Sequence, residues 1–166
     1  MRFILLLSPI LLLAGCASAP RAASPDAEAR AAIQAQLRRM ENAARRGDAE
    51  GFVAADSVIT LTTPDGRSGT RTRAELVQDQ RQRWAQIVET KQIEYVADSL
   101  TVRGDTAIVY TRQRWERVVR DAQGQPHTRL TQASHRETWI RRPRGWRTRA
   151  VQILSQGPNF TDGKQQ

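Results

Sequence analysis

Long runs of alternating residues fill the second half of the chain, and this pattern most limits the folds available to it. In the run 106–119 every second residue would share one face of a strand: Ala107, Val109, Thr111, Gln113 and Trp115. Comparable runs occupy 91–103, 128–141 and 146–155, with turn-forming residues between them. The sequence therefore predicts an antiparallel meander of long strands.

The first half of the chain has helical spacing instead. Apolar residues recur every three or four positions from Ala29 to Ala44, which forms one apolar stripe on an amphipathic helix. Ser24 suits the N-cap and Pro25 the first helical position, while Gly47 suits the end of the helix. A long helix is therefore predicted from residue 25 up to the glycine.

Two more helices are predicted after the first. One is short, runs from Asp48 through Ala55 and leads into a strand at 58–62. The other begins at Thr72, because Thr72 and Glu75 have the Thr-x-x-Glu spacing of a capping box.

Helices followed by a meander indicate an α+β fold, in which the helices pack on one face of a curved, mainly antiparallel sheet. The folded domain is expected to span 25–156, which is long enough to bury a real core. The polar tail 157–166 is expected to be disordered.

The N-terminus has the pattern of an export signal. Arg2 precedes an apolar run at 3–13, which is too short for a membrane-spanning helix and fits a secretory signal. The residues Leu13-Ala14-Gly15-Cys16 resemble the bacterial lipobox. This resemblance implies that residues 1–15 are cleaved as a signal peptide and that Cys16 is lipidated. The alternative is an ordinary signal peptide in which Cys16 has no such role.

Lipidation of Cys16 would anchor the protein to a membrane. Residues 16–24, which contain Pro20 and no large apolar side chain, then form a flexible linker. The domain would face the periplasm, and Ala17 favours the outer membrane by resemblance to Gram-negative lipoproteins. Cys16 is also the only cysteine, which excludes an internal disulfide framework and a multi-cysteine zinc site.

Several short motifs occur in an order that resembles a known superfamily. They are Arg46-Gly47-Asp48, Pro64-Asp65-Gly66, Gly104-Asp105-Thr106, Thr138-Trp139-Ile140 and Gly145-Trp146-Arg147. Across 29–156 their order and spacing resemble the NTF2-like superfamily, in its DUF4440 and SnoaL-like branch. The resemblance implies a cone, in which a bent sheet wraps around a long helix and leaves a cavity. Members include ketosteroid isomerase-like, polyketide cyclase-like and dehydratase-like proteins and binding proteins without activity, so the fold alone assigns no function.

Isomerase chemistry on this fold needs a carboxylate base and a pair of hydrogen-bond donors, commonly a Tyr and a protonated Asp. The sequence contains no convincing set of this kind. Asp56 is the candidate base, because relatives often carry an acidic residue near the cavity at the end of the second helix. The alternative is a carboxylate that bonds to helix-end backbone. Tyr110 lies opposite to Ala107 and Val109 in the alternation and is expected on the outer face.

Gln113 and Trp115 continue the face that is expected to line the cavity. On the next two strands, the rows that contain Arg136 and Gln152 are expected to face it as well. There Arg136 could clamp a carboxylate or phosphate, or it pairs with Asp56 or a neighbouring carboxylate. Gln152 either bonds a ligand or satisfies backbone groups.

Trp84, Trp115 and Trp146 are candidate ligand contacts, although such tryptophans more often belong to a core. His127 falls in a loop and His135 has the opposite parity to the expected cavity row, so both are expected to be solvated or half-exposed. Neither has acidic partners at metal-ligand spacing, and no nucleotide-binding motif is present. No metal and no cofactor are expected.

These features predict a lipid-anchored protein of the cell envelope that binds a small organic ligand in its cone cavity, an anionic one if Arg136 contacts it. One alternative is a cofactor-independent isomerase, lyase or hydrolase, with Asp56 as base and with Arg136 and Gln152 orienting the substrate. The other is a non-enzymatic assembly or protein-interaction module. Relatives often pair through the sheet, so the resemblance also implies a homodimer.

The formal net charge of +9 comes mainly from the second half of the chain. Residues 101–150 hold 12 basic and 4 acidic side chains, whereas 16–100 hold 12 of each. A basic excess can bind nucleic acid, but an exported protein is not expected to meet it. The excess predicts instead a basic sheet face and rim beside an anionic envelope surface, with an Arg-rich composition bias as the alternative.

Overall fold

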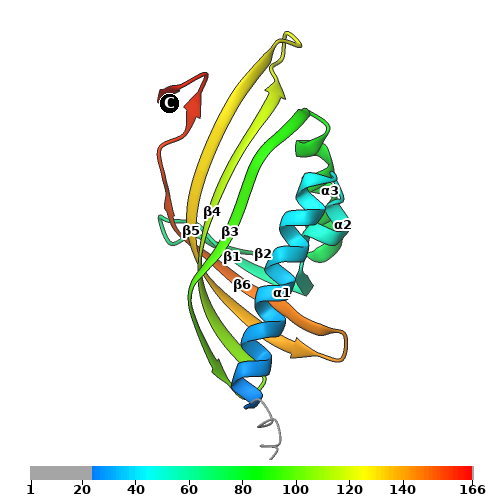
Figure 1. Ribbon diagram of the computed structural model, residues 1–166, viewed down its shortest axis with the longest axis vertical. Coiled ribbons are helices and arrows are strands. Elements are labelled where there is room, and N and C mark those ends of the chain that lie inside the picture. The colour runs from blue at the N-terminus through cyan, green and yellow to red at the C-terminus, as the bar shows by residue number, and fades with distance from the viewer. Residues whose placement is uncertain (1–23, 166) are drawn as a thin grey trace, which may run out of the picture.

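A strongly bent sheet wraps around one long helix in the computed structural model, which describes residues 24–165 (Figure 1). The elements in chain order are α1 (Pro25–Arg45), α2 (Ala49–Phe52), β1 (Ala55–Thr62), β2 (Ser68–Thr72), α3 (Arg73–Trp84), β3 (Ile87–Arg103), β4 (Thr106–Arg120), β5 (Pro126–Arg142), β6 (Gly145–Gln156), β7 (Phe160–Thr161) and β8 (Lys164–Gln165). The predicted α+β class is confirmed. The predicted signal peptide, Cys16 and the predicted linker up to residue 23 lie outside the described residues.

The sheet is mixed, and its main strand order is β2-β1-β6-β5-β4-β3. The predicted meander is confirmed in β3 to β6, whose neighbours pair antiparallel. β1 is the exception, because it pairs in parallel with β6. In Figure 1 the strands β3, β4 and β5 curve past the helices, so their concave face is turned toward α1, α2 and α3.

Helix α1 supplies the apolar stripe that fills the concave side of the sheet. Leu37 shares one buried cluster with Trp139 and Trp146 from β5 and β6. The predicted helix start is confirmed, since the Ser24 hydroxyl accepts a hydrogen bond from the backbone N–H of Ala27 at 3.2 Å. The cap and the buried stripe together fix where the helix begins and how it is rotated against the sheet.

The next two helices differ in how well the sequence predicts them. Helix α2 is shorter than predicted, because the chain becomes extended at Val53. Ala55 already pairs with Thr148 as the first residue of β1, so the sheet takes up these backbone groups. The capping box of α3 is confirmed: the Thr72 hydroxyl accepts from the Glu75 backbone N–H at 3.2 Å, and the Glu75 carboxylate accepts from the Thr72 backbone N–H at 2.7 Å.

The C-terminal tail is ordered up to residue 165, so the predicted disorder is wrong. β5 extends beyond the end of β6, which leaves part of its edge without a partner from β6. β7 returns to that edge and pairs Phe160 with Leu130 and Thr161 with Arg129. Backbone pairing with a distant strand edge therefore orders a segment whose polar composition suggested disorder.

Candidate functional site

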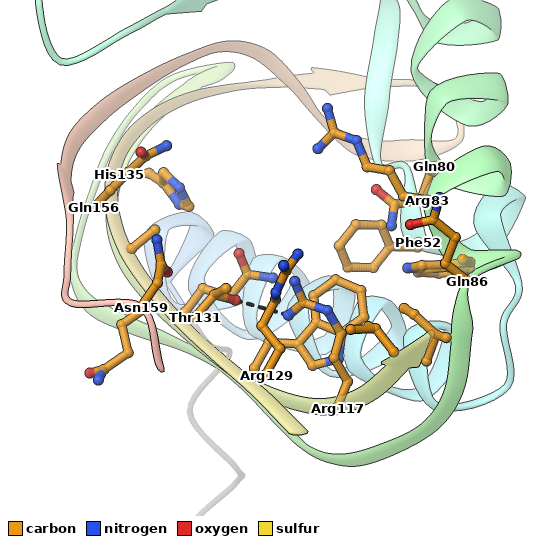
Figure 2. A pocket seen from close by; sticks show the side chains of 17 residues that line it. Phe52, Gln80, Arg83, Gln86, Arg117, Arg129, Thr131, His135, Gln156 and Asn159 are labelled. Carbon is orange, nitrogen blue, oxygen red and sulfur yellow. Dashed lines mark hydrogen bonds between the residues drawn. The ribbon is translucent and has the colours of Figure 1, made fainter. Parts of the chain in front are cut away.

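A cavity of about 490 Å³ lies between helices α2 and α3 and the inner face of β4 and β5 (Figure 2). Phe52, Trp84 and Trp115 form its aromatic wall, with ring centroids 5.4 Å apart between Phe52 and Trp84 and 6.1 Å apart between the two tryptophans. Gln113, on the inner row of β4, also lines the cavity. The structure thus brings Trp84, Gln113 and Trp115 together, and their contact with a ligand stays a prediction.

Three arginines line the same cavity: Arg117 on β4, Arg129 on β5 and Arg83 on α3 (Figure 2). None of its lining residues is Asp or Glu. The Arg117 guanidinium lies 4.6 Å from the centre of the Trp115 ring and donates a hydrogen bond to the Thr131 hydroxyl at 2.9 Å. Burial, together with the charges of Arg129 and Arg83, lowers the pKa of Arg117 to about 10. The side chain therefore remains protonated at neutral pH.

A buried carboxylate lies next to the cavity. Glu137 on β5 is 1% exposed. It accepts hydrogen bonds from the Tyr95 hydroxyl, from Thr111 Oγ1 at 2.9 Å and from Trp139 Nε1 at 2.8 Å. Burial raises the pKa of Glu137 although these three donors act in the opposite direction. Burial, followed by the charge of Glu137, also raises the pKa of Tyr95.

His135 connects this hydrogen-bond network to the cavity, which it lines. Its Nδ1 lies 3.5 Å from Thr111 Oγ1 and 3.9 Å from Glu137 Oε1, and its ring stacks with Tyr95 at 6.4 Å between centroids. Because Thr111 donates its own proton to Glu137, its oxygen can accept from an Nδ1–H group, which leaves Nε2 as the basic nitrogen. Burial lowers the pKa of His135, so its imidazole is neutral at neutral pH.

The predicted orientation of β5 is wrong, because the row of side chains expected on its inner face lies on its outer face. The register pairs Thr111 with His135 and Tyr110 with Arg136, so His135 shares the inner face and Arg136 the outer one. Tyr110 is 41% exposed, which confirms its expected outer position. The row of His135 and Glu137 has the polarity of a solvated face, but internal hydrogen bonds satisfy these side chains and allow their burial. Sequence reasoning missed Glu137 for this reason.

Gln152 also lies on the outer face, contrary to its predicted orientation. Thr148 pairs with Trp139, whereas the next pair joins Ala150 to Thr138, so β6 contains one extra residue at this point. Such a bulge moves the following residues to the other face. Thr148 is therefore buried and Gln152 is exposed. The only signal that could have revealed the bulge is the hydrophobic pattern after it, where Val151 and Ile153 take the inner parity.

Asp56 does not line the cavity but a separate groove beside the β5–β6 turn. Its carboxylate accepts hydrogen bonds from Arg142 at 2.7 and 3.3 Å, and Arg149 Nη1 lies 3.7 Å away. The bond from Arg142 is the main cause that lowers the pKa of Asp56. The expected cavity position is wrong, and the partner of Asp56 is Arg142 rather than Arg136. Trp146, in the core with α1, does not line the cavity either.

His127 forms a second polar cluster at the far end of β5. Its Nδ1 lies 2.6 Å from the Asp162 carboxylate and its Nε2 lies 3.0 Å from the Asp121 carboxylate. Across residues 24–165, no group of three or more His, Cys, Asp or Glu side chains is placed to hold a metal ion. In the same part of the chain, no helix is both long and apolar enough to cross a membrane.

The sequence matches no protein-family model and no curated protein. Solved structures do resemble the fold. The Kfla4162 protein from Kribbella flavida superposes with a TM-score of 0.64 at 16% identity, covering 78% of this chain and 93% of that one. An NTF2-like superfamily protein from Salmonella enterica gives 0.58 at 17% identity, with coverage of 76% and 89%. A domain of unknown function with a cystatin-like fold from Nostoc punctiforme gives 0.54 at 20% identity, with coverage of 76% on both chains.

The architecture is therefore the cystatin-like α+β fold of NTF2-like proteins, as predicted. At these identities the likeness establishes the fold alone. Within that fold, the cavity of this chain holds three arginines, an aromatic wall and one histidine, with no carboxylate among the lining side chains.

Proposed function

We propose that this protein binds a small anionic organic ligand in the cavity between α3 and the inner face of β4 and β5. The observation that carries the proposal is the half-buried Arg117 guanidinium, which has two further arginines beside it and, within residues 24–165, no carboxylate partner. Its hydrogen-bond partner, the Thr131 hydroxyl, is neutral and leaves the charge uncompensated. Taking a charge partly out of water without a counterion is costly, and a bound anion would reduce that cost.

The composition of the cavity suggests the rest of the ligand. Phe52, Trp84 and Trp115 offer an apolar wall, and Gln113 offers an amide. A volume of about 490 Å³ suits a compound of metabolite size. A ligand with an anionic group at Arg117 and a ring or apolar body against the tryptophans would use both surfaces.

The test is a thermal-shift and calorimetric screen on a chain that begins at residue 17 and so contains every described residue. Small aromatic carboxylates and phosphates should bind, whereas their uncharged amides and methyl esters should not. Arg117→Gln should abolish binding, and Arg103→Gln, which changes an exposed arginine outside the cavity, should leave it unchanged. Equal binding of charged and uncharged analogues would contradict the proposal.

A second candidate function is cofactor-independent acid–base catalysis in the same cavity. It is supported by the hydroxyl bridge from His135 through Thr111 to the buried Glu137, which favours a neutral imidazole with Nε2 as proton acceptor. This candidate agrees with the isomerase, lyase or hydrolase alternative of the DUF4440 and SnoaL-like branch, with His135 in place of Asp56.

The tautomer of His135 tests this candidate without a known substrate. The chain has only two histidines, so ¹⁵N NMR resolves the ring nitrogens of His135 with His127 as an internal comparison. We expect a protonated Nδ1 that becomes a mixture of tautomers in Thr111→Val. A protonated Nε2 in the unmodified protein would remove the candidate base.

The location proposed for this activity is the cell envelope, with Cys16 as the lipid anchor. The support is the Leu13-Ala14-Gly15-Cys16 motif after a short apolar run. Cys16→Ser should move the protein from the membrane fraction to the soluble fraction when the membranes are washed at high salt, which screens electrostatic attraction. Unchanged membrane association after that wash would exclude the lipid anchor. A non-enzymatic assembly module is the remaining alternative, and it predicts no small-molecule binding at Arg117.

A further inference from the structure

A second hollow of about 910 Å³ lies on the outside of the domain, between α1, α2 and the turn that joins β5 to β6. It shares no lining residue with the cavity. Six arginines line it against two carboxylates, Glu50 and Asp56. We call it the arginine groove; its arginines are Arg39, Arg46, Arg73, Arg142, Arg144 and Arg147.

Only part of this positive charge is neutralised inside the groove. Glu50 pairs with Arg73 at 2.8 Å, and Asp56 pairs with Arg142 at 2.7 Å. Arg46 approaches only Asp48, outside the groove lining, at 4.0 Å. The other three arginines have no ion pair with any described residue.

Two of these three guanidiniums are nonetheless held in position. Arg39 donates from Nε and Nη2 to the side-chain oxygen of buried Gln36, at 3.1 and 2.7 Å. Arg147 donates from Nη1 to the backbone carbonyl of Trp146 at 3.2 Å. Neutral acceptors orient these side chains without cancelling their charge, and such an arrangement favours an anion. Arg144 is exposed in the turn and adds a third charge.

We propose that the arginine groove binds the phosphate groups of anionic lipids. A guanidinium binds phosphate oxygens through two parallel hydrogen bonds, and several in one open groove suit phosphates presented side by side on a surface. The groove is also close to where the chain enters the domain, because Arg142 and Pro143 of its turn line a smaller hollow together with Pro25.

The choice of lipid over free phosphate rests on the proposed lipid anchor. Pro25 is nine positions after Cys16, so an extended linker reaches at most about 30 Å. A lipidated Cys16 would therefore keep the arginine groove close to a headgroup surface, where each arginine adds to the attraction.

The experiment is vesicle flotation of the chain that begins at residue 17, which has no acyl anchor. It should float with phosphatidylcholine vesicles that contain phosphatidylglycerol and not with phosphatidylcholine alone, and salt should weaken the binding. The triple variant Arg39→Gln, Arg144→Gln, Arg147→Gln should reduce partitioning about 100-fold. The matched control is Arg71→Gln, Arg103→Gln, Arg120→Gln, which removes the same charge from exposed positions outside the groove and should retain most of the binding.

Each result decides the assignment. Equal loss of vesicle binding in the two triple variants would show that net charge alone attracts the protein to the membrane. It would overturn the assignment of lipid binding to the arginine groove. Binding of inorganic pyrophosphate without vesicle binding would overturn the lipid assignment, as would the absence of any binding. Arg117→Gln should not affect flotation, so failure of the cavity proposal and failure of this one are distinguishable. Because the assay lacks the acyl chain, its result is also independent of whether Cys16 is lipidated.

Discussion

The phenol of Tyr95 donates a hydrogen bond to the carboxylate of Glu137, and this bond joins β3 to β5 across the inner face of β4. Thr111 on β4 and Trp139 on β5 donate to the same carboxylate. A single acidic side chain thus satisfies three buried donors at the point where the core passes into the cavity. Its removal should cost more than the loss of one hydrogen bond, because all three donors would remain buried.

Glu137→Ala should therefore lower the free energy of unfolding by about 3 to 5 kcal/mol, whereas Glu137→Gln, which keeps the shape and one acceptor, should cost about 1 kcal/mol. Urea denaturation at neutral pH measures both values. Glu89→Gln, at an exposed position of β3, serves as the control and should be nearly neutral. Equal effects of the alanine and glutamine variants would contradict the network.

Ionisation of Glu137 should make stability fall as pH rises. Burial raises the folded-state pKa of this carboxyl above its ordinary value of 4.5, so folding favours the protonated form. The contribution is fully present below the unfolded pKa and is lost as pH rises through the folded pKa. The difference in unfolding free energy between the unmodified protein and Glu137→Gln should decrease over that interval, and a difference that is constant with pH would refute the assignment.

His127 should give a second pH dependence, located at the C-terminal hairpin of β7 and β8. Hydrogen bonds that the imidazolium donates to the Asp162 and Asp121 carboxylates raise the pKa of His127 above 6.5. The imidazolium therefore stabilises the hairpin below 6.5, and this stabilisation is lost as pH rises through the folded pKa. Amide exchange of 157–165, corrected for intrinsic rates, should show weaker protection at high pH. His127→Gln should lack this pH dependence, and its persistence in the variant would assign it to other groups.

Asp56→Asn tests whether the cavity and the arginine groove are independent of each other. It breaks the ion pair with Arg142 at a partly exposed site, so the expected loss of stability is about 1 kcal/mol. Ligand binding in the cavity should be unchanged, because Asp56 does not line it. Calorimetry with any ligand that depends on Arg117 measures the second effect. A loss of ligand affinity larger than the loss of stability accounts for would show that Asp56 contributes to the cavity.

The outer face of the sheet is the surface predicted to form a homodimer. Val96, Tyr110 and Leu154 are 45%, 41% and 43% exposed there. We expect the chain from residue 17 to elute as a dimer, and Tyr110→Arg to convert it to a monomer, because a charge would be buried at the interface. Size-exclusion chromatography with light scattering measures both masses. A monomeric unmodified protein would end the dimer prediction.

Local signals along the chain predicted most of the fold. The Ser24 cap, the capping box of Thr72 and Glu75 and the alternation from Ala107 to Trp115 all depend on neighbours within a few residues, and each is confirmed. The cavity could be predicted in part for the same reason. Trp115 is on the correctly oriented strand β4 and lies at the aromatic wall.

The remaining site residues depended on interactions between distant strands. His135 and Glu137 turn inward because Tyr95 and Thr111, far away in sequence, supply their hydrogen bonds. Arg136 is left outside as a result, so the cationic groups of the cavity come from other positions.

The sequence by itself thus determined the order of the helices and of the strands other than β2, β7 and β8, and the excess of arginine in the second half of the chain. Only the tertiary structure decided which arginines of the sheet line the cavity, because the strand register and the bulge before Ala150 set the face that each strand side chain takes. It also ordered the tail, since the edge of β5 that binds β7 exists only after the sheet has formed. Alternating residues in a sequence indicate a strand, but they show neither which set of side chains faces the core nor which strand lies beside it. Both depend on hydrogen bonds between strands that are distant in sequence.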